Sequence, residues 1–92
     1  MPEFHSAALS VIHNDAMEPG GGPALHRHPY EEVFLILEGE ATFTLGNETL
    51  VARAGDFLVA PPGVPHAFKN TGTGVLRSVD VHNSPTFSTE WL

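Results

Sequence analysis

The chain has 92 residues, a formal net charge of −7, six His and no Cys. This length fits one domain, residues 1–92, and the lack of Cys excludes disulfide bonds and thiolate metal sites, so a metal would need His nitrogens and carboxylate oxygens. Only four cations are present and they are scattered, which argues against a nucleic acid or an anionic membrane as a partner. Without a long apolar run or a basic-then-apolar N-terminus, we expect no transmembrane helix, no signal peptide and a cytoplasmic location.

Short apolar runs with a period of two residues, separated by Gly, Pro and Asn, predict an all-β chain. Strands are expected at 8–14, 25–28, 32–37, 41–45, 48–52, 57–60, 67–70 and 75–82. Residues 18–23 form a loop after the first strand, and Gly46 with Asn47 forms a tight hairpin turn, because both residue types tolerate positive φ. Such closely spaced short strands predict a sandwich or a barrel.

The strand at 32–37 is apolar on both faces after Glu32. One face lines the interior, and the outer face, with Val33, Leu35 and Leu37, needs cover from a second sheet or from a second subunit. Both interpretations stay open. Charged residues are only 16% of the chain, below the usual share of roughly a quarter, and this favours a homodimer interface.

Two segments near the C-terminus have uncertain surroundings. In the strand at 75–82, period-two burial favours Val79 and Val81 inside, with Asp80 and His82 in solvent or at an interface. The opposite orientation would place Asp80 and His82 at the interior as supporting or acid–base groups. The tail carries three large apolar residues, which we expect on the barrel, on a partner or across a cavity mouth: Phe87, Trp91 and Leu92. His5 and His13 are expected on the surface.

His26 and His28 lie two residues apart, so on a strand they point to the same face. Glu32 follows at the head of the next strand, and His66 begins a later one. Three imidazoles and a carboxylate suit one divalent transition metal per chain: Mn, Fe, Ni, Co, Cu or Zn. Taken alone, a His-x-His pair is more often a pair of surface polar residues.

Two spaced patterns include these residues. They are Gly20-x5-His26-x-His28-x3-Glu32-x6-Gly39, within residues 20–39, and Gly55-x5-Pro61-x-Gly63-x2-His66-x3-Asn70, within residues 55–70. They resemble the two motifs of the cupin superfamily, and all ten fixed positions are filled. The resemblance implies an antiparallel jelly-roll β-barrel, often dimeric. It also implies that His26, His28, Glu32 and His66 are the metal ligands and that Asn70 and the glycines are structural.

Apolar residues are expected beside this site, which predicts a small, largely apolar pocket. Phe34 and Ile36 are in register with Glu32, and Phe68 is in register with His66, with Phe43 and Phe57 as further candidates. Four protein ligands on an octahedral metal leave two positions where a substrate can chelate.

These features favour a metal-dependent enzyme of dioxygenase or isomerase/cyclase type that acts on a small, largely apolar organic substrate. Glu32 is a candidate catalytic base. The alternatives are a non-catalytic small-molecule binding or sensing module with a structural metal, and a storage barrel without metal.

Overall fold

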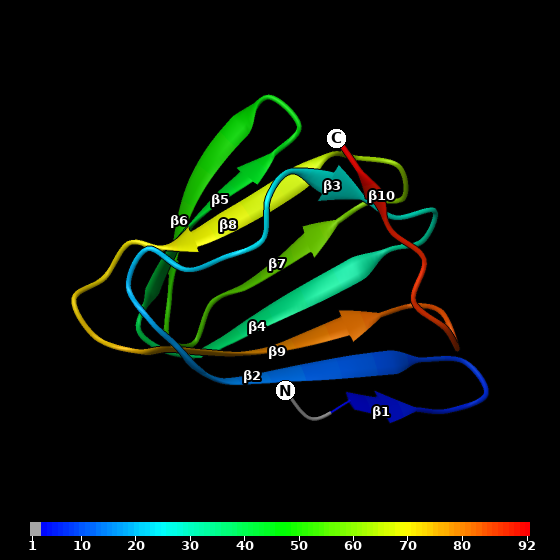
Figure 1. Cartoon of the computed structure of the whole chain (residues 1–92), viewed down its shortest axis with the longest axis horizontal. Coiled ribbons are helices and arrows are strands. Elements are labelled where there is room, and N and C mark those ends of the chain that lie inside the picture. Colours follow the sequence, from blue (N-terminus) through cyan, green and yellow to red (C-terminus); the bar gives the residue numbers. More distant parts are fainter. Residues whose placement is uncertain (1–2) are drawn as a thin grey trace.

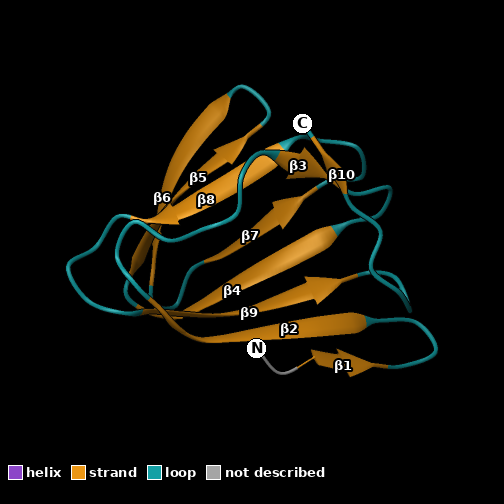
Figure 2. Cartoon of the chain, in the orientation of Figure 1, coloured by secondary structure: helices purple, strands orange, loops and turns teal. Residues whose placement is uncertain are grey.

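The computed structural model describes residues 3–92, which form ten strands and no helix (Figure 1, Figure 2). The strands are β1 (Glu3–His5), β2 (Ser10–Met17), β3 (His26–Arg27), β4 (Glu32–Glu38), β5 (Glu40–Leu45), β6 (Glu48–Arg53), β7 (Phe57–Ala60), β8 (His66–Asn70), β9 (Leu76–His82) and β10 (Glu90–Trp91). No helix long and apolar enough to cross a membrane occurs in the described part of the chain. The eight predicted strand regions are all present. The short strands β1 and β10 were not predicted.

The strands form two five-stranded sheets with antiparallel pairing, in the orders β1-β2-β9-β4-β7 and β10-β3-β8-β5-β6. Figure 1 shows the first sheet in the lower part of the view and the second in the upper part, with the C-terminal strand β10 beside β3. The fold is the all-β jelly roll that was expected. Because most neighbours in each sheet are distant in sequence, residues from both predicted motifs meet between the two sheets.

Turn chemistry explains the local connections. Leu45 pairs with Glu48, so Gly46 and Asn47 form the predicted two-residue hairpin loop. Of these two loop residues, Gly46 has a positive φ, of 57°, and Asn47 does not. The turn therefore needs a left-handed conformation at its first position alone. Gly39, between β4 and β5, has φ of 90°, and a Cβ there would lie 2.5 Å from the carbonyl oxygen of Val75. Position 39 therefore requires glycine, both because the backbone is left-handed there and because a Cβ would clash with Val75.

The apolar core lies at one end of the interior. It consists of Phe34, Ile36, Ala41, Phe43, Ala52, Ala60, Phe68 and Leu76. The rings of Phe34 and Phe43 meet edge to face at 5.0 Å, and those of Phe43 and Phe68 stack at 4.9 Å between centroids. Full burial of each Phe side chain contributes roughly 2–3 kcal/mol through the hydrophobic effect. Phe57, a further pocket candidate from the sequence, is 66% exposed, because its register on β7 turns it to the outer face.

Asn70, at the end of β8, holds three backbone groups. Its Nδ2 donates to the carbonyls of Met17 and Gly74, both at 2.9 Å, and its Oδ1 accepts from the Gly72 amide at 3.0 Å. The side chain therefore joins the turn after β8 to the end of β2. This agrees with the structural role that the sequence resemblance implied for Asn70.

Candidate metal centre

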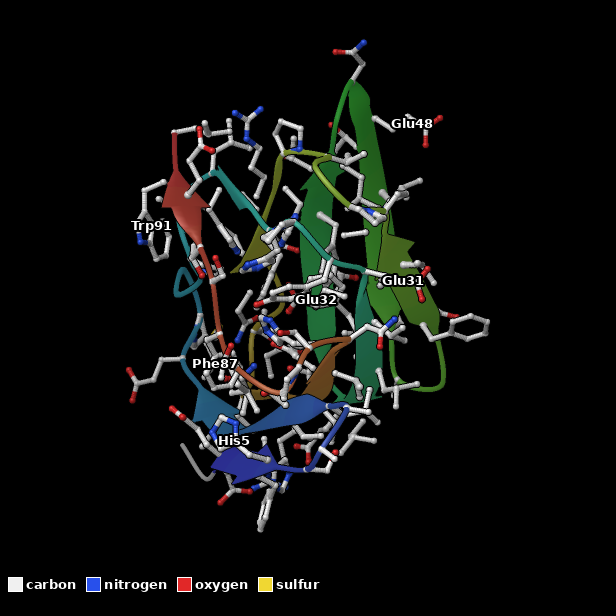
Figure 3. The ribbon with its side chains drawn as sticks, turned by 90° about the vertical axis from the view of Figure 1, so that its right-hand side faces the viewer. His5, Glu31, Glu32, Glu48, Phe87 and Trp91 are labelled. Atoms are coloured by element: carbon white, nitrogen blue, oxygen red, sulfur yellow. The ribbon has the colours of Figure 1, made fainter. Side chains whose placement is uncertain are left out.

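The four residues that were expected to bind metal come together between the two sheets. His26 lies on β3, His28 directly after it, Glu32 at the start of β4 and His66 at the start of β8. All four side chains are buried, and their ligand atoms lie within 4.8 Å of one another. Figure 3 shows Glu32 in the interior, whereas its neighbour Glu31 points outward. The cluster could hold a metal ion.

Backbone carbonyls orient the three imidazole rings. In each ring Nδ1 lies within hydrogen-bond distance of a carbonyl oxygen, at 2.7 Å for His26 and Ala24, 2.8 Å for His28 and Ser88, and 3.1 Å for His66 and Val64. A carbonyl oxygen only accepts, so Nδ1 carries the proton in each ring and Nε2 of the neutral ring has a free lone pair. Rings held in this way present Nε2 as a ligand atom.

The Nε2 atoms of two of these rings point toward the same carboxylate oxygen. Nε2 of His28 and Nε2 of His66 lie 3.0 and 3.1 Å from the same oxygen, Oε1 of Glu32. Within residues 3–92, Nε2 of His28 is the buried side-chain atom that has no hydrogen-bond partner. Neutral imidazoles and a carboxylate would repel one another in this arrangement, and either a proton on Nε2 or a metal cation among them removes the repulsion. The three nitrogens and the carboxylate oxygen fit a borderline divalent metal.

Burial and charge shift the protonation equilibria of the cluster. Burial acts to lower the pKa of His28, but its hydrogen bond with Glu32 outweighs burial and raises the pKa, so a metal displaces a proton from His28. Burial lowers the pKa of His26, which favours its neutral form. For Glu32, burial acts to raise the pKa, but the close imidazoles of His28, His66 and His82 outweigh it and hold the pKa well below its ordinary value. Glu32 is therefore a carboxylate at neutral pH.

The orientation of β9 is opposite to the one favoured by the sequence. Ser78, Asp80 and His82 point into the interior and are buried, whereas Val79 and Val81 are half-buried on the outer face. The prediction was wrong because this end of the interior is polar, so apolar residues do not mark the inner face. The adjacent strand β2 carried a signal for this, since its buried residues are also polar: Ser10 and Asn14.

His82 contacts Glu32 as a donor. The Ser88 amide lies 3.2 Å from the Tyr30 hydroxyl and donates to it, which leaves the Tyr30 O–H to donate to Nδ1 of His82 at 2.7 Å. Nε2 of His82 then carries the hydrogen and donates to Oε2 of Glu32 at 3.1 Å. The other carboxylate oxygen, Oε1, is left to the metal cluster. Tyr30, His82 and Ser88 are thus supporting residues that the sequence motifs did not identify.

The C-terminal segment closes one side of the site. Its strand β10 pairs with β3, with Trp91 opposite His26. The Trp91 ring lies 4.9 Å from the His26 ring, and the Phe87 ring lies 4.8 Å from the His82 ring. Of the three positions considered for the tail, the structure shows two together: β10 extends the sheet beside β3, and Phe87 and Trp91 line the cavity, with Leu92 55% exposed.

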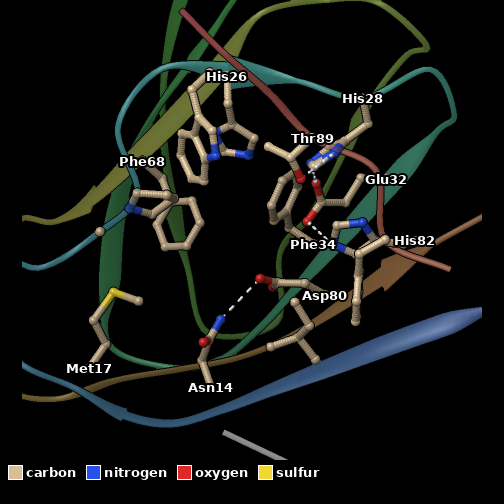
Figure 4. A pocket seen from close by; sticks show the side chains of 15 residues that line it. Asn14, Met17, His26, His28, Glu32, Phe34, Phe68, Asp80, His82 and Thr89 are labelled. Carbon is tan, nitrogen blue, oxygen red and sulfur yellow. Dashed lines mark hydrogen bonds and ion pairs between the residues drawn. The ribbon is translucent and has the colours of Figure 1, made fainter. Parts of the chain in front are cut away.

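A cavity of about 450 Å³ opens beside the cluster (Figure 4). It is lined by Ile12, Asn14, Met17, Gly22, Pro23, His26, His28, Glu32, Phe34, Phe68, Asp80, His82, Phe87, Thr89 and Trp91. Phe34 and Phe68 line it as expected, but Ile36 lies in the apolar core and is not a lining residue. No Lys or Arg of the described chain lines this cavity.

Comparison with known protein families matches residues 15–82 to the cupin domain. The chain belongs to the cupin family. This cupin is 38% identical over 77 residues to an uncharacterized protein of Methanocaldococcus jannaschii, a match that covers 83% of the chain and 62% of that protein. It is 34% identical over 61 residues to the HTH-type transcriptional regulator PuuR of Escherichia coli, which covers 66% of the chain and 33% of the regulator. The matches therefore span between a third and three fifths of these relatives.

Solved structures share the fold. A conserved Klebsiella pneumoniae protein with a double-stranded β-helix domain has a TM-score of 0.84 and 26% identity, over 95% of this cupin and 76% of that chain. The oxalate decarboxylase of Lactobacillus farciminis, solved as a formate complex, has a TM-score of 0.78 and 29% identity, over 91% of this cupin and 26% of that chain. About a quarter of that larger enzyme, 26% of its chain, thus corresponds to nearly all of this chain.

Proposed function

We propose that this cupin binds one divalent transition metal ion through His26, His28, Glu32 and His66 and acts as a metal-dependent enzyme. The observation that carries the proposal is the buried contact of the His28 and His66 Nε2 atoms with one Glu32 oxygen, at 3.0 and 3.1 Å, without a proton donor for Nε2 of His28. The candidate metals are Mn, Fe, Ni, Co, Cu and Zn, because all accept this set of ligands.

The cavity favours a small, largely apolar substrate that chelates the metal, such as a dicarbonyl, an enol or a small aromatic. A divalent ion held by the four residues would polarise the chelating oxygens of such a substrate. Phe34, Phe68 and Phe87 line the cavity and would contact the apolar part of such a substrate. A small dicarboxylate would meet Glu32 and Asp80 but no Lys or Arg, so the lining disfavours a dianion.

Asp80 is better placed than Glu32 to move a proton. Burial, and next the charge of Glu32, raise the pKa of Asp80 to about 7, while hydrogen bonds from Ser78 and Asn14 oppose the shift. When no cation is bound beside it, a carboxyl group with this pKa both donates and accepts protons near neutral pH, as isomerase or cyclase chemistry requires. The lowered pKa of Glu32 makes it a weak base and suits it to hold the metal instead.

Elemental analysis of tag-free protein tests the metal. We expect close to one transition metal ion per chain, lost in His26→Ala and His66→Ala. His13→Ala is the matched control, because His13 is only half-buried and lies outside the cluster. If His26→Ala and His66→Ala both keep the metal content of the wild type, these residues are not metal ligands and the site is wrong. Oxygen uptake and product analysis with diketones and catechols, metal by metal, then test the enzyme activity.

A second function is a binding or sensing module with a structural metal. The similarity to part of the transcriptional regulator PuuR favours it, since the match lies in the cupin region of this chain. Isothermal titration followed by chromatography of the bound compound separates the two functions. A sensing module returns the compound unchanged from the metal-loaded protein, whereas an enzyme converts it.

We also propose that the chain forms a homodimer through the outer face of β4, β7 and β9. This face is apolar and consists of Val33, Leu35, Leu37, Phe57, Val59, Val79 and Val81. Leu37 and Phe57 are 53% and 66% exposed, and a second copy would bury them. Light scattering at micromolar concentration tests this: Leu35→Glu should give monomers, whereas Val51→Glu, on the other sheet, should not. A monomeric wild type removes the proposal. A cytoplasmic location stays a prediction.

A further inference from the structure

One wall of the cavity presents only hydrogen-bond acceptors. Asn14 Nδ2 donates to Ser78 Oγ at 2.9 Å and to Asp80 Oδ2 at 3.0 Å, and Ser78 Oγ donates to Asp80 Oδ1 at 3.1 Å. These three bonds use both amide hydrogens and the hydroxyl hydrogen. What is left on this wall is Oδ1 of Asn14, which makes no hydrogen bond within residues 3–92, and the remaining lone pairs of the Asp80 carboxylate. Asn14 and Asp80 are each only 4% exposed.

The charge of Asp80 has no counter-ion in the described chain. The three Arg side chains pair with Glu residues away from the cavity, and Lys69 is exposed: the pairs are Arg27–Glu90, Arg53–Glu40 and Arg77–Glu38. Buried carboxylates in folded proteins are normally paired, because an isolated buried charge is costly. The raised pKa of Asp80 agrees with this missing partner.

The acceptor wall lies across the cavity from His26, the proposed ligand on the opposite sheet. Figure 4 shows Asn14 and Asp80 on the lower side of the cavity and His26 on the upper side, with Phe68 and Met17 beside the space between them. Asn14 and Asp80, on β2 and β9, belong to the same sheet as Glu32 on β4, whereas His26 on β3 and His66 on β8 belong to the other sheet. A ligand that reaches from the His26 side to this wall passes Phe68 and Met17, so its middle part is apolar.

We propose that Asn14 and Asp80 form a subsite for an ammonium group of the ligand. The ligand then carries chelating oxygens at one end, an apolar middle and a protonated amine at the other end. The chelating end rests on the proposed metal site, whereas the ammonium end does not. Ser78 positions the Asp80 carboxylate and has no direct contact with the ligand in this proposal.

Three probes of matched size test the subsite in the metal-loaded protein. Dopamine, 4-ethylcatechol and 3,4-dihydroxyphenylacetate share the chelating catechol and differ only in a cationic, neutral or anionic end. Anaerobic titration calorimetry measures the three dissociation constants. We expect dopamine to bind at least about tenfold more tightly than 4-ethylcatechol, because one charge-assisted hydrogen bond contributes that much affinity. The anion should bind most weakly. In Asp80→Asn this preference should fall to within about twofold, with 4-ethylcatechol little affected.

Asp15→Asn is the control, because Asp15 is exposed on the same strand as Asn14 and changes the net charge equally. A preference for dopamine that survives in Asp80→Asn or disappears in Asp15→Asn overturns the subsite. Equal or tighter binding of 4-ethylcatechol by the wild type also overturns it.

A second arm needs no metal. Phenethylamine and 2-phenylethanol are titrated into metal-free protein while the Asn14 side-chain amide signal is followed by NMR. We expect phenethylamine, and not the alcohol, to shift this signal in wild type but not in Asp80→Asn. If no catechol binds but phenethylamine behaves as expected, the metal proposal fails and the subsite stands. If the alcohol shifts the signal equally, or neither probe does, the ammonium subsite fails.

Discussion

Nε2 of His82 donates to Oε2 of Glu32 at 3.1 Å, and this contact separates His82 from the other three histidines of the site. The rings of His26, His28 and His66 donate a hydrogen bond from Nδ1 to a backbone carbonyl, which leaves Nε2 as the nitrogen that can bind a metal. His82 has the opposite tautomer, because the Tyr30 hydroxyl donates to its Nδ1. One cluster thus holds three potential ligands and one donor that fixes the carboxylate.

The Tyr30–His82 contact should tune metal affinity. Tyr30→Phe keeps the ring that stacks on His28 at 5.0 Å but removes the hydroxyl that sets the His82 tautomer. We expect metal affinity to fall about tenfold, as for other groups that orient a ligand, and His82→Leu to lower it at least as far. Competition with a chelator measures the Kd. Wild-type affinity in both variants would show that this chain of hydrogen bonds does not support the site.

The C-terminal segment should be part of the metal site. Removal of residues 87–92 deletes the Ser88 carbonyl that accepts from His28 and the Trp91 ring on His26. We expect the β fold to persist in circular dichroism and metal affinity to fall about tenfold or more. Deletion of Leu92 alone is the control, because its side chain is more than half exposed. Equal metal affinity of the variant without residues 87–92 and the variant without Leu92 alone would contradict the role given to the segment.

Asp80 should make stability depend on pH in a known direction. Its pKa is raised in the folded chain to about 7 from an ordinary value of 3.8. The folded state therefore holds the proton more tightly, and this contribution to stability is present below about pH 4 and is lost as the pH rises to about 7. Metal-free wild type should lose stability relative to Asp80→Asn over this window, with a slope up to about 1.4 kcal/mol per pH unit.

Urea unfolding of both proteins between pH 4 and 8, with a chelator present, measures this difference. Glu32 acts in the opposite direction, since its lowered pKa gives stability that is lost only as the pH falls below its ordinary value of 4.5, at the lower edge of this range. A stability difference independent of pH would show that Asp80 is not a buried, uncompensated acid.

Gly39 should tolerate no side chain. Gly39→Ala places a Cβ 2.5 Å from the Val75 carbonyl oxygen at a φ of 90°, so we expect a loss of about 2 kcal/mol or more in the free energy of unfolding. Gly74→Ala is the matched control, because no heavy atom lies within 4 Å of a Cβ at Gly74 and its φ is not positive. Urea unfolding of both variants compares them, and equal losses would contradict the clash.

Local patterns were sufficient for much of the fold and the candidate site. The alternation of apolar residues predicted the strands, and Gly46 with Asn47 predicted the hairpin between β5 and β6, because both depend on neighbours along the chain. The motifs also identified His26, His28, Glu32 and His66, each of which lies at the start of a strand or directly after one.

The tertiary structure alone decided which polar groups surround that cluster. Val79 and Val81 looked like the inner face of β9, yet Asp80 and His82 are inside, because the partners that satisfy them come from β2 and β4. Ser88 reaches His28 from 60 positions away through a backbone carbonyl, an atom that every residue has and that no sequence pattern distinguishes. The sequence by itself therefore determined the strands and the four potential ligands. Only the folded chain determined the hydrogen bonds that orient them, because those bonds join atoms that are distant in sequence.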